Sequence, residues 1–331
     1  AGTAMRFLTA FFSMQENRVV VLTGTSRMQE RPIHILVDAL KILGADIQYL
    51  NQEGFPPLKI KGRKLQSNKI AIPANISSQY ISALLLIAPK LENGLSLELI
   101  GEQTSLPYIK MTLALLNEIG VETTFIGNQI HVFPKTKAEP KTITVESDWS
   151  SASYFFELIA FSEIGTSLKI QKLKSNSLQA DRAVVEIFEQ FGVKTHFLPN
   201  NEIQITKANN QLPSEINLNL IECPDIAQTI AVTCFGLGIK ANLTGLHTLK
   251  IKETDRLVAL KNELEKFGAI VEITKDSLFL HERNLQNVLP ENVLVKTYQD
   301  HRMAMAFAPL ALFTALEIEN AEVVSKSYPK F

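Results

Sequence analysis

Cysteine is scarce in this chain, and the two that occur, Cys223 and Cys234, have no metal-binding spacing. Neither belongs to a CxxC pair, so the sequence predicts no thiolate metal site and no disulfide framework. Reduced thiols are typical of a cytoplasmic protein, and the cytoplasm is the location that we expect. No other pattern in the sequence calls for a metal ion or a cofactor.

Excess charge and long apolar runs are missing as well. The 331 residues carry a formal net charge of −1, which gives no reason to expect a nucleic-acid partner. The longest apolar runs, at residues 84–88 and 303–313, are too short to span a bilayer. We therefore expect neither a nucleic acid nor a membrane as a partner. The length and a hydrophobic content of 46% allow two globular domains.

An internal repeat is what the sequence does contain. An apolar helix pattern runs into a glycine at intervals of about 75 residues, at Gly44, Gly120, Gly192 and Gly268. The apolar spacing predicts one buried helix face, and the glycine supplies the left-handed residue that ends the helix. A second series of helices is predicted to begin near Thr3, Ser78, Ser151, Ile226 and His301.

Short alternating stretches after each glycine predict β-hairpins, and a further strand, such as residues 143–145 or 293–295, leads to the next helix. The repeating unit is therefore βαβαββ, and about four and a half copies are present. Stacked units of this kind predict an α/β (α+β) fold, a two-domain inside-out barrel with helices inside curved sheets. A boundary near residues 145–148 gives an incomplete first domain over 1–146 and a second over 147–331.

Charged side chains gather where the predicted helices begin, at residues 252–256 and 300–303. For either segment alone, a capping residue with solvated charges is the simpler interpretation. Basic side chains at a helix start oppose the helix dipole, however, so a recurring cluster needs a counter-anion. Hydroxyl, amide and arginine side chains in the equivalent repeat positions are suited to phosphate and carboxylate. The sequence therefore predicts an anion-binding site.

Six segments resemble, in order, those of the 3-phosphoshikimate 1-carboxyvinyltransferase (EPSP synthase) family: residues 1–6, 27–32, 77–79, 105–108, 252–256 and 300–304. The resemblance implies transfer of the enolpyruvyl group of phosphoenolpyruvate to the 5-hydroxyl of shikimate 3-phosphate, with release of phosphate. It places the chain in aromatic amino-acid biosynthesis and implies glyphosate as an inhibitor. It also implies that the two domains close over the substrates.

The resemblance assigns roles residue by residue. Asp225 is implied to take the proton of the attacking hydroxyl, and Glu253 to protonate the methylene carbon and later remove that proton. Shikimate 3-phosphate is implied to bind Ser77, Ser78, Gln79, Ser105, Asp225 and Lys252. Phosphoenolpyruvate is implied to bind Gly2, Arg27, Gln79, Arg256, Arg302 and Lys326.

The sequence departs from the family in two places. Family members have an asparagine shortly before Lys252, where this chain has His247 and Thr248. They also have an earlier segment of about one repeat, with further substrate-binding residues, and a final helix beyond Phe331. We therefore expect a truncated, monomeric chain that is inactive by itself.

Two alternatives remain open at the sequence level. A UDP-N-acetylglucosamine enolpyruvyl transferase has a similar fold, but it requires a reactive cysteine in a mobile loop, and neither cysteine is so placed. A non-catalytic repeat protein that keeps an anion-binding surface is the second alternative.

Overall fold

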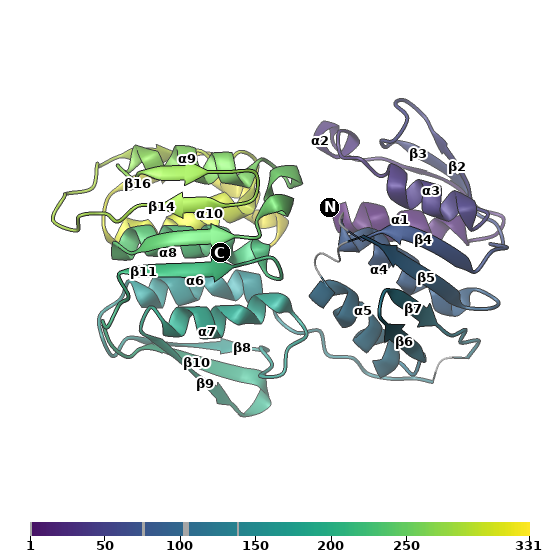
Figure 1. Cartoon of the computed structure of the whole chain (residues 1–331), viewed down its shortest axis with the longest axis horizontal. Coiled ribbons are helices and arrows are strands. Elements are labelled where there is room, and N and C mark those ends of the chain that lie inside the picture. Colours follow the sequence, from purple (N-terminus) through teal and green to yellow (C-terminus); the bar gives the residue numbers. More distant parts are fainter. Residues whose placement is uncertain (1, 75–76, 102–105, 138) are drawn as a thin grey trace. The chain divides into compact units, whose positions relative to one another are not determined.

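A computed structural model describes the chain except for residues 1, 75–76, 102–105 and 138. The chain forms two compact units, Ala1–Ile143 and Thr144–Phe331, each with a hydrophobic core of its own. Both units alternate helices and strands (Figure 1).

The first unit contains two copies of the repeat. Its helices are α1 (Gly2–Ser13), α2 (Ser26–Gln29), α3 (His34–Ile42), α4 (Ser78–Ile87), the 3-10 helix η1 (Ala88–Lys90) and α5 (Leu106–Glu118). Its strands are β1 (Val19–Leu22), β2 (Asp46–Tyr49), β3 (Leu58–Lys61), β4 (Lys69–Pro73), β5 (Leu95–Ile100), β6 (Thr123–Ile126) and β7 (Gln129–Val132).

Two sheets cover the helices of this unit. One has the antiparallel order β1-β3-β2, and the other has the order β4-β5-β7-β6, in which β4 and β5 are parallel. Leu97 pairs with Ile70 on one side and with Ile130 on the other, and this row faces the core. Helix α4 packs against both α1 and α5.

The second unit continues the pattern. Its α-helices are α6 (Trp149–Ala160), α7 (Val184–Glu189), α8 (Ala227–Leu237), α9 (Arg256–Lys266) and α10 (His301–Phe307). Its 3-10 helices are η2 (Ala180–Ala183), η3 (Pro199–Asn201), η4 (Pro224–Ile226), η5 (His247–Ile251), η6 (Ala308–Leu312) and η7 (Ala321–Lys326).

The strands of the second unit are β8 (Ser167–Gln171), β9 (Val193–Leu198), β10 (Glu202–Lys207), β11 (Glu215–Asn219), β12 (Lys240–Thr244), β13 (Val271–Ile273), β14 (Leu278–Leu280), β15 (Val293–Val295) and β16 (Leu316–Ile318). They form sheets of order β8-β10-β9, β11-β12-β14-β13 and β15-β16. The four-stranded sheet repeats the topology of β4-β5-β7-β6, since β11 and β12 are also parallel.

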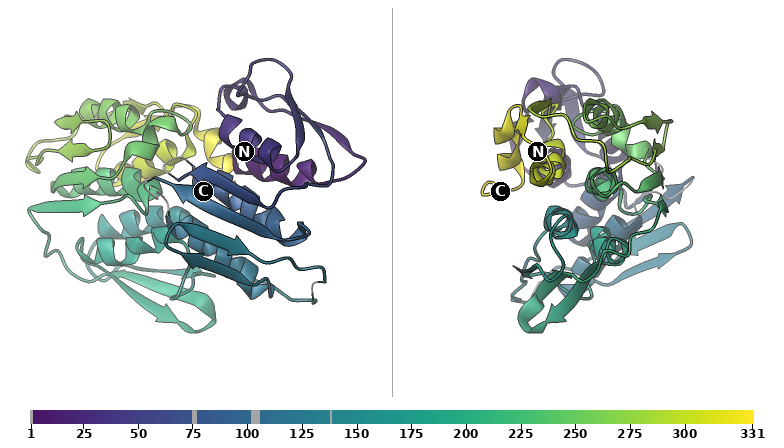
Figure 2. Two further views of the ribbon diagram at one scale, coloured as in Figure 1. Left: turned by 45° about the vertical axis from the view of Figure 1, so that its right-hand side comes forward. Right: turned by 90° about the vertical axis from the view of Figure 1, so that its left-hand side faces the viewer.

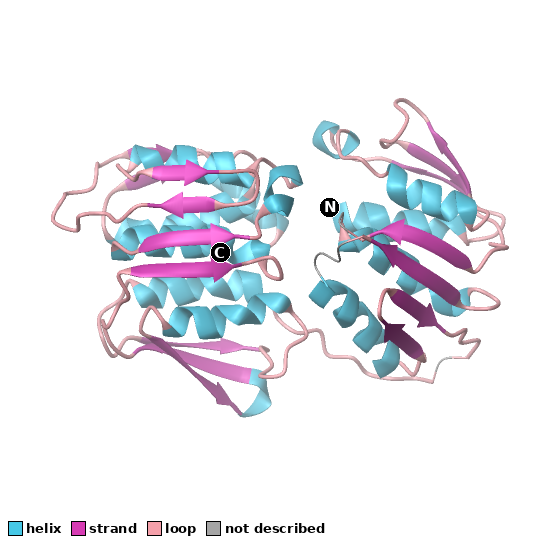
Figure 3. Cartoon of the chain, viewed as in Figure 1, coloured by secondary structure: helices cyan, strands magenta, loops and turns pink. Residues whose placement is uncertain are grey.

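Helices lie inside the second unit and strands outside. Helix α8 contacts both α6 and α10, and nearly all of its residues are buried. Figure 2, right, shows helices of this unit nearly end-on, with strands beside them. A helix buried on all sides needs apolar or small residues nearly all round, and the sequence of α8 supplies them except at the buried Gln228. The predicted arrangement of helices within curved sheets is confirmed (Figure 3).

The repeat glycines have the predicted conformation. Gly44, Gly120, Gly192 and Gly268 all have φ between 77° and 106°, each just past the end of a helix. The strand predicted at residues 143–145 is not formed, because Val145 is 83% exposed and finds no neighbouring strand among the described residues. The described residues between β7 and α6 form no helix or strand.

Candidate functional site

Arg256 is the centre of the charged cluster in the second unit. Its side chain is only 2% exposed and donates from Nε to Asp300 Oδ2 at 2.7 Å and from Nη1 to Asp225 Oδ1 at 2.8 Å. A third bond runs from Nη2 to Glu253 Oε2 at 2.9 Å. A buried guanidinium in the first turn of a helix is tolerable only with such compensation. Arg256 therefore gathers three carboxylates from three separate segments.

Asp225 lies against two more cations. The Lys252 ammonium is 3.3 Å from Asp225 Oδ1, and Arg302 Nη2 is 3.5 Å from Asp225 Oδ2. Burial raises the pKa of Asp225, but the charges of Lys252, Arg302 and Arg256 outweigh it and hold that pKa well below its ordinary value. Asp225 is thus an ionised carboxylate, and its side chain is 20% exposed.

Asp300 begins helix α10 and orients Arg302. Its fully buried carboxylate accepts from the Arg302 backbone N–H at 2.9 Å, as an N-cap does. Burial raises the pKa of Asp300, but the charge and the hydrogen bond of Arg256 lower it more. Arg302 also donates from Nη1 to the Asp225 carbonyl at 3.1 Å. The starts of α9 and α10 are therefore joined through charged pairs.

Lys326 reaches the same end of α10 from the C-terminal segment. Its ammonium donates to the Gln299 carbonyl at 2.8 Å, one residue before Asp300. Four predicted substrate ligands thus meet in this cluster. Lys252 and Arg302 contact Asp225, Arg256 contacts both Asp225 and Asp300, and Lys326 bonds to the turn that carries Asp300.

Asp181 is a member of this cluster that sequence reasoning missed. It lies in η2, is 5% exposed, and its Oδ1 has no hydrogen-bond partner among the described residues. Burial, and then the charge of Asp225, raise the pKa of Asp181 to about 7. One feature of the sequence could have pointed to Asp181. It follows the polar segment 175–177, and this segment occupies the repeat position that the Arg256 motif occupies in a later repeat.

A second cationic cluster lies in the first unit at the start of α1. Arg6 donates from Nη1 to Gln79 Oε1 at 2.6 Å, and its guanidinium stacks on the Tyr80 ring. A Cβ placed on Gly2 would lie 2.9 Å from the Nη1 atoms of both Arg6 and Arg31. Two guanidinium groups therefore lie at the glycine that begins the helix. Backbone N–H groups and paired guanidinium groups suit a carboxylate or phosphate.

The two arginines of the 27–32 motif are placed differently. Arg27 lies on α2, is 55% exposed, and donates to Glu30 at 3.0 Å. Arg31, four residues later and beyond the end of α2, is the one beside Gly2. Arg27 stays a predicted phosphoenolpyruvate ligand, and the structure places Arg31 of the same motif beside Gly2. The sequence alone could not show which of the two arginines lies at the start of α1.

The hydroxyl residues predicted to hold shikimate 3-phosphate lie at the start of α4. Ser77 is its N-cap and accepts from the Gln79 backbone N–H at 3.4 Å, and the buried Ser78 is its first residue. Gln79 follows and bonds to Arg6, which joins this helix start to that of α1. Ser105, the remaining predicted ligand, lies outside the described residues.

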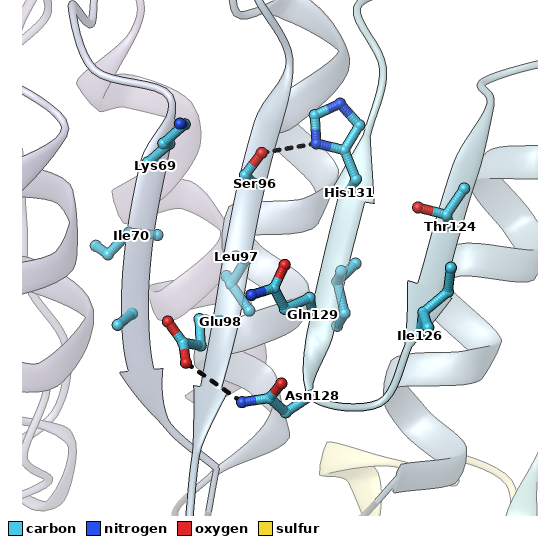
Figure 4. A pocket seen from close by; sticks show the side chains of 12 residues that line it. Lys69, Ile70, Ser96, Leu97, Glu98, Thr124, Ile126, Asn128, Gln129 and His131 are labelled. Carbon is cyan, nitrogen blue, oxygen red and sulfur yellow. Dashed lines mark hydrogen bonds between the residues drawn. The ribbon is translucent and has the colours of Figure 1, made fainter.

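A groove of about 860 Å³ lies elsewhere, on one face of the sheet β4-β5-β7-β6. Figure 4 shows its polar side chains, with Ser96 bonded to His131 and Asn128 to Glu98. It contains none of the predicted site residues. Hydrogen-bonded pairs on the polar face of a sheet are ordinary surface features, so the charged clusters define the candidate site.

The part of the chain that the structure describes contains neither a candidate metal site nor a candidate membrane-spanning helix. No group of three or more histidine, cysteine, aspartate or glutamate side chains could hold a metal ion there. Among the described residues, no helix is both long enough and apolar enough to cross a lipid bilayer.

The fold and the clusters define an α/β protein of repeated units with cations at its helix starts. A sequence model of the family "EPSP synthase (3-phosphoshikimate 1-carboxyvinyltransferase)" matches residues 1–331. The chain belongs to this EPSP synthase family.

Relatives agree with this assignment. The 3-phosphoshikimate 1-carboxyvinyltransferase of Bacteroides fragilis (strain YCH46) is 45% identical, over 100% of this chain and 80% of the relative. That of Haemophilus influenzae (strain ATCC 51907) is 38% identical, over 100% of this chain and 76% of the relative. A solved EPSP synthase from Acinetobacter baumannii has a TM-score of 0.78 at 24% identity and covers 99% of this chain and 75% of its own. Neither alternative function is favoured by these matches.

Proposed function

We propose that the chain catalyses the reaction of its family and that the charged residues of each cluster serve as its substrate and catalytic groups. In that reaction the enolpyruvyl group of phosphoenolpyruvate passes to the 5-hydroxyl of shikimate 3-phosphate, and phosphate leaves. The observation that supports the proposal most is Arg256, which holds the two predicted catalytic carboxylates, Asp225 and Glu253, on one buried guanidinium. Addition followed by elimination needs one proton acceptor and one proton donor close together.

Asp225 is proposed as the base for the attacking hydroxyl. Without substrate, the charges of Lys252, Arg302 and Arg256 keep its pKa low, so it is ionised but weakly basic. Substrate phosphate and carboxylate groups would partly neutralise those cations. The pKa of Asp225 would then rise, and the carboxylate would become a better proton acceptor when the substrates are in place.

Glu253 is proposed to deliver the proton to the methylene carbon of phosphoenolpyruvate and to remove it again in the elimination step. Its carboxylate is 30% exposed, more than that of Asp225, and it is tied to Arg256 Nη2. An accessible carboxylate beside a buried arginine can face a substrate while its position stays fixed.

The remaining residues are proposed as anion and hydroxyl ligands. Phosphoenolpyruvate is assigned to the cations Arg27, Arg256, Arg302 and Lys326 with Gly2 and Gln79, and the position of Arg31 beside Gly2 adds Arg31 to this set. Shikimate 3-phosphate is assigned to residues of both units. In the first unit these are Ser77, Ser78 and Gln79 at the start of α4, together with Ser105, and in the second unit they are Lys252 and Asp225.

We further propose that the protein acts in the cytoplasm as a monomer, with these two metabolites as its partners and glyphosate as its inhibitor. The reduced, buried state of Cys223 and Cys234 supports a cytoplasmic location. Burial also raises the pKa of Cys223 to about 12, which argues against the reactive thiolate of the UDP-sugar reaction.

The decisive experiment compares Asp225→Asn with the unchanged sequence, both in the full-length protein, in an assay of phosphate release. The variant should lose about 10²–10⁴-fold in kcat, because it lacks the base, while shikimate 3-phosphate still binds. Glu215→Gln, at an exposed ion pair with Lys240 in the same unit, is the matched control and should change little. Retention of turnover by Asp225→Asn would overturn the assignment of the base.

Calorimetry separates the remaining candidate, a non-catalytic anion-binding protein. Shikimate 3-phosphate and glyphosate should each strengthen binding of the other if both substrate sets serve one reaction. Absence of heat with either ligand would favour the non-catalytic alternative.

A further inference from the structure

The turn before helix α10 has an unfavourable backbone conformation. Residues 296–299 connect β15 to Asp300, and within them Tyr298 has φ 53° and Gln299 has φ 61°. Two consecutive side-chain-bearing residues in the left-handed region are costly and persist only where surrounding contacts hold them. This turn delivers Asp300 and Arg302 to the charged cluster, so its contacts bear on the site.

Glu263 supplies those contacts from helix α9. Its carboxylate is fully buried, and it accepts from the Tyr298 hydroxyl at 2.7 Å and from the Lys296 backbone N–H at 2.9 Å. The Lys266 ammonium completes its coordination and also donates to the Leu294 carbonyl at 2.8 Å. A buried carboxylate with three donors is well satisfied, so it can fix the turn rather than destabilise the core.

Helix α9 also bonds to Asp300, the residue that follows the turn. Arg256 begins α9 and bonds to Asp300, while Glu263 lies two turns further along and bonds to the residues before it. One rigid helix thus fixes the turn on both sides. Lys326 adds a bond to the Gln299 carbonyl.

We propose that Glu263 and Tyr298 are positioning residues for the reaction. Their hydrogen bond keeps Tyr298 and Gln299 in the left-handed conformation, and this sets Asp300 against Arg256 and Arg302 against Asp225. Neither residue is assigned a contact with substrate. The effect on substrate rests on the proposed function, whereas the effect on the turn does not.

Hydrogen exchange of the backbone amides tests the structural step. Tyr298→Phe removes the hydroxyl and keeps the ring, so amides of residues 298–302 should exchange roughly tenfold faster. Exchange in the hairpin of β9 and β10 should stay the same. The matched control is Thr314→Val, which removes a 2.8 Å bond to the Pro290 carbonyl in the same unit and should leave the turn unchanged.

Two results of that measurement would overturn the proposal. One is unchanged exchange at residues 298–302. The other is equal acceleration throughout the second unit, because this would show that the bond contributes only to global stability.

Steady-state kinetics test the functional step. Tyr298→Phe should raise KM for phosphoenolpyruvate roughly tenfold and leave KM for shikimate 3-phosphate within about twofold, because the turn carries Arg302. Glu263→Gln keeps one acceptor oxygen, so its defect should be smaller than that of Glu263→Ala. Equal changes in both KM values would contradict positioning. The kinetics are measured in the full-length protein, and absence of turnover by the unchanged full-length protein would count against the proposed function alone, since the exchange result stands independently.

Discussion

At the scale of single residues, the structure adds a second arginine to the candidates of one predicted motif. Arg31 lies beside Gly2 and Arg6, whereas Arg27 pairs with Glu30 on an exposed helix. Four residues of sequence separate the two, and no periodicity distinguishes them. Which of the two side chains lies at the start of α1 depends on the path of the backbone after α2. Only the three-dimensional structure shows that path.

The first prediction uses this pair. Arg31→Met should weaken phosphoenolpyruvate binding about 10- to 100-fold, because a charge-assisted hydrogen bond to the anion is lost. Arg27→Met should cause the smaller loss, and Lys64→Met, at an exposed pair with Glu92, serves as the control. Isothermal titration with phosphoenolpyruvate in the presence of shikimate 3-phosphate measures the difference. A larger loss at Arg27 would show that Arg27, rather than Arg31, is the main phosphoenolpyruvate ligand of this motif.

The second prediction concerns the pH dependence of stability at Asp181. The ordinary pKa of an aspartate is 3.8, and burial raises that of Asp181 to about 7 in the folded chain. Between these values the folded state holds a proton that the unfolded state releases, so this contribution to stability is lost as pH rises from about 4 to 7.

Asp181→Asn should therefore stabilise the chain relative to the parent at pH 8 but not at pH 4, by an order of a few kcal/mol. Glu157, which is fully buried with a raised pKa, acts in the same direction in both proteins and cancels in the comparison. Thermal unfolding across this pH range provides the measurement. A constant difference in Tm would contradict the prediction.

At the scale of elements, the repeat was the most predictable feature. Helix ends at glycine and helix starts at capping residues are local properties. Ser77, Asp255 and Asp300 are the caps of α4, α9 and α10, whereas the pattern alone pointed to Thr254 rather than Asp255 as the cap of α9. The missing strand at residues 143–145 shows the limit, because strand formation depends on a partner that local sequence does not reveal. Asp181 was missed for a similar reason, since its burial comes from distant segments.

The third prediction compares two repeat glycines. A Cβ on Gly192 would lie 2.2 Å from the Asn209 carbonyl oxygen, whereas one on Gly268 would meet no atom within 4 Å. Both have positive φ, so alanine at either position costs about 1–2 kcal/mol through left-handed strain. Gly192→Ala should lose more in addition, because backbone atoms must move. Urea denaturation of both variants provides the comparison, and equal losses would show that the loop at Asn209 yields freely.

At the scale of the whole molecule, the chain has two separate cores. The core of the first unit includes Leu40 and that of the second includes Phe188, which packs against Phe156 and Phe191. Each unit buries its own apolar surface, so each has its own source of stability.

The fourth prediction follows from this division. Phe188→Ala should destabilise the second unit by about 3–5 kcal/mol, because a fully buried ring is replaced by a cavity. Leu40→Ala should act in the same way on the first unit, by about 2–5 kcal/mol. Scanning calorimetry should show two transitions, of which each variant lowers a different one. A single transition lowered equally by both variants would show that the units unfold together.

The burial of both thiols has a practical consequence for labelling the chain. Cys223 and Cys234 are inaccessible, and burial raises the pKa of each, so maleimide reagents near neutral pH should leave them unmodified. A cysteine introduced on an exposed loop of each unit would then carry a fluorophore without removal of the native pair. Energy transfer between fluorophores on the two units could therefore be measured without first replacing Cys223 and Cys234.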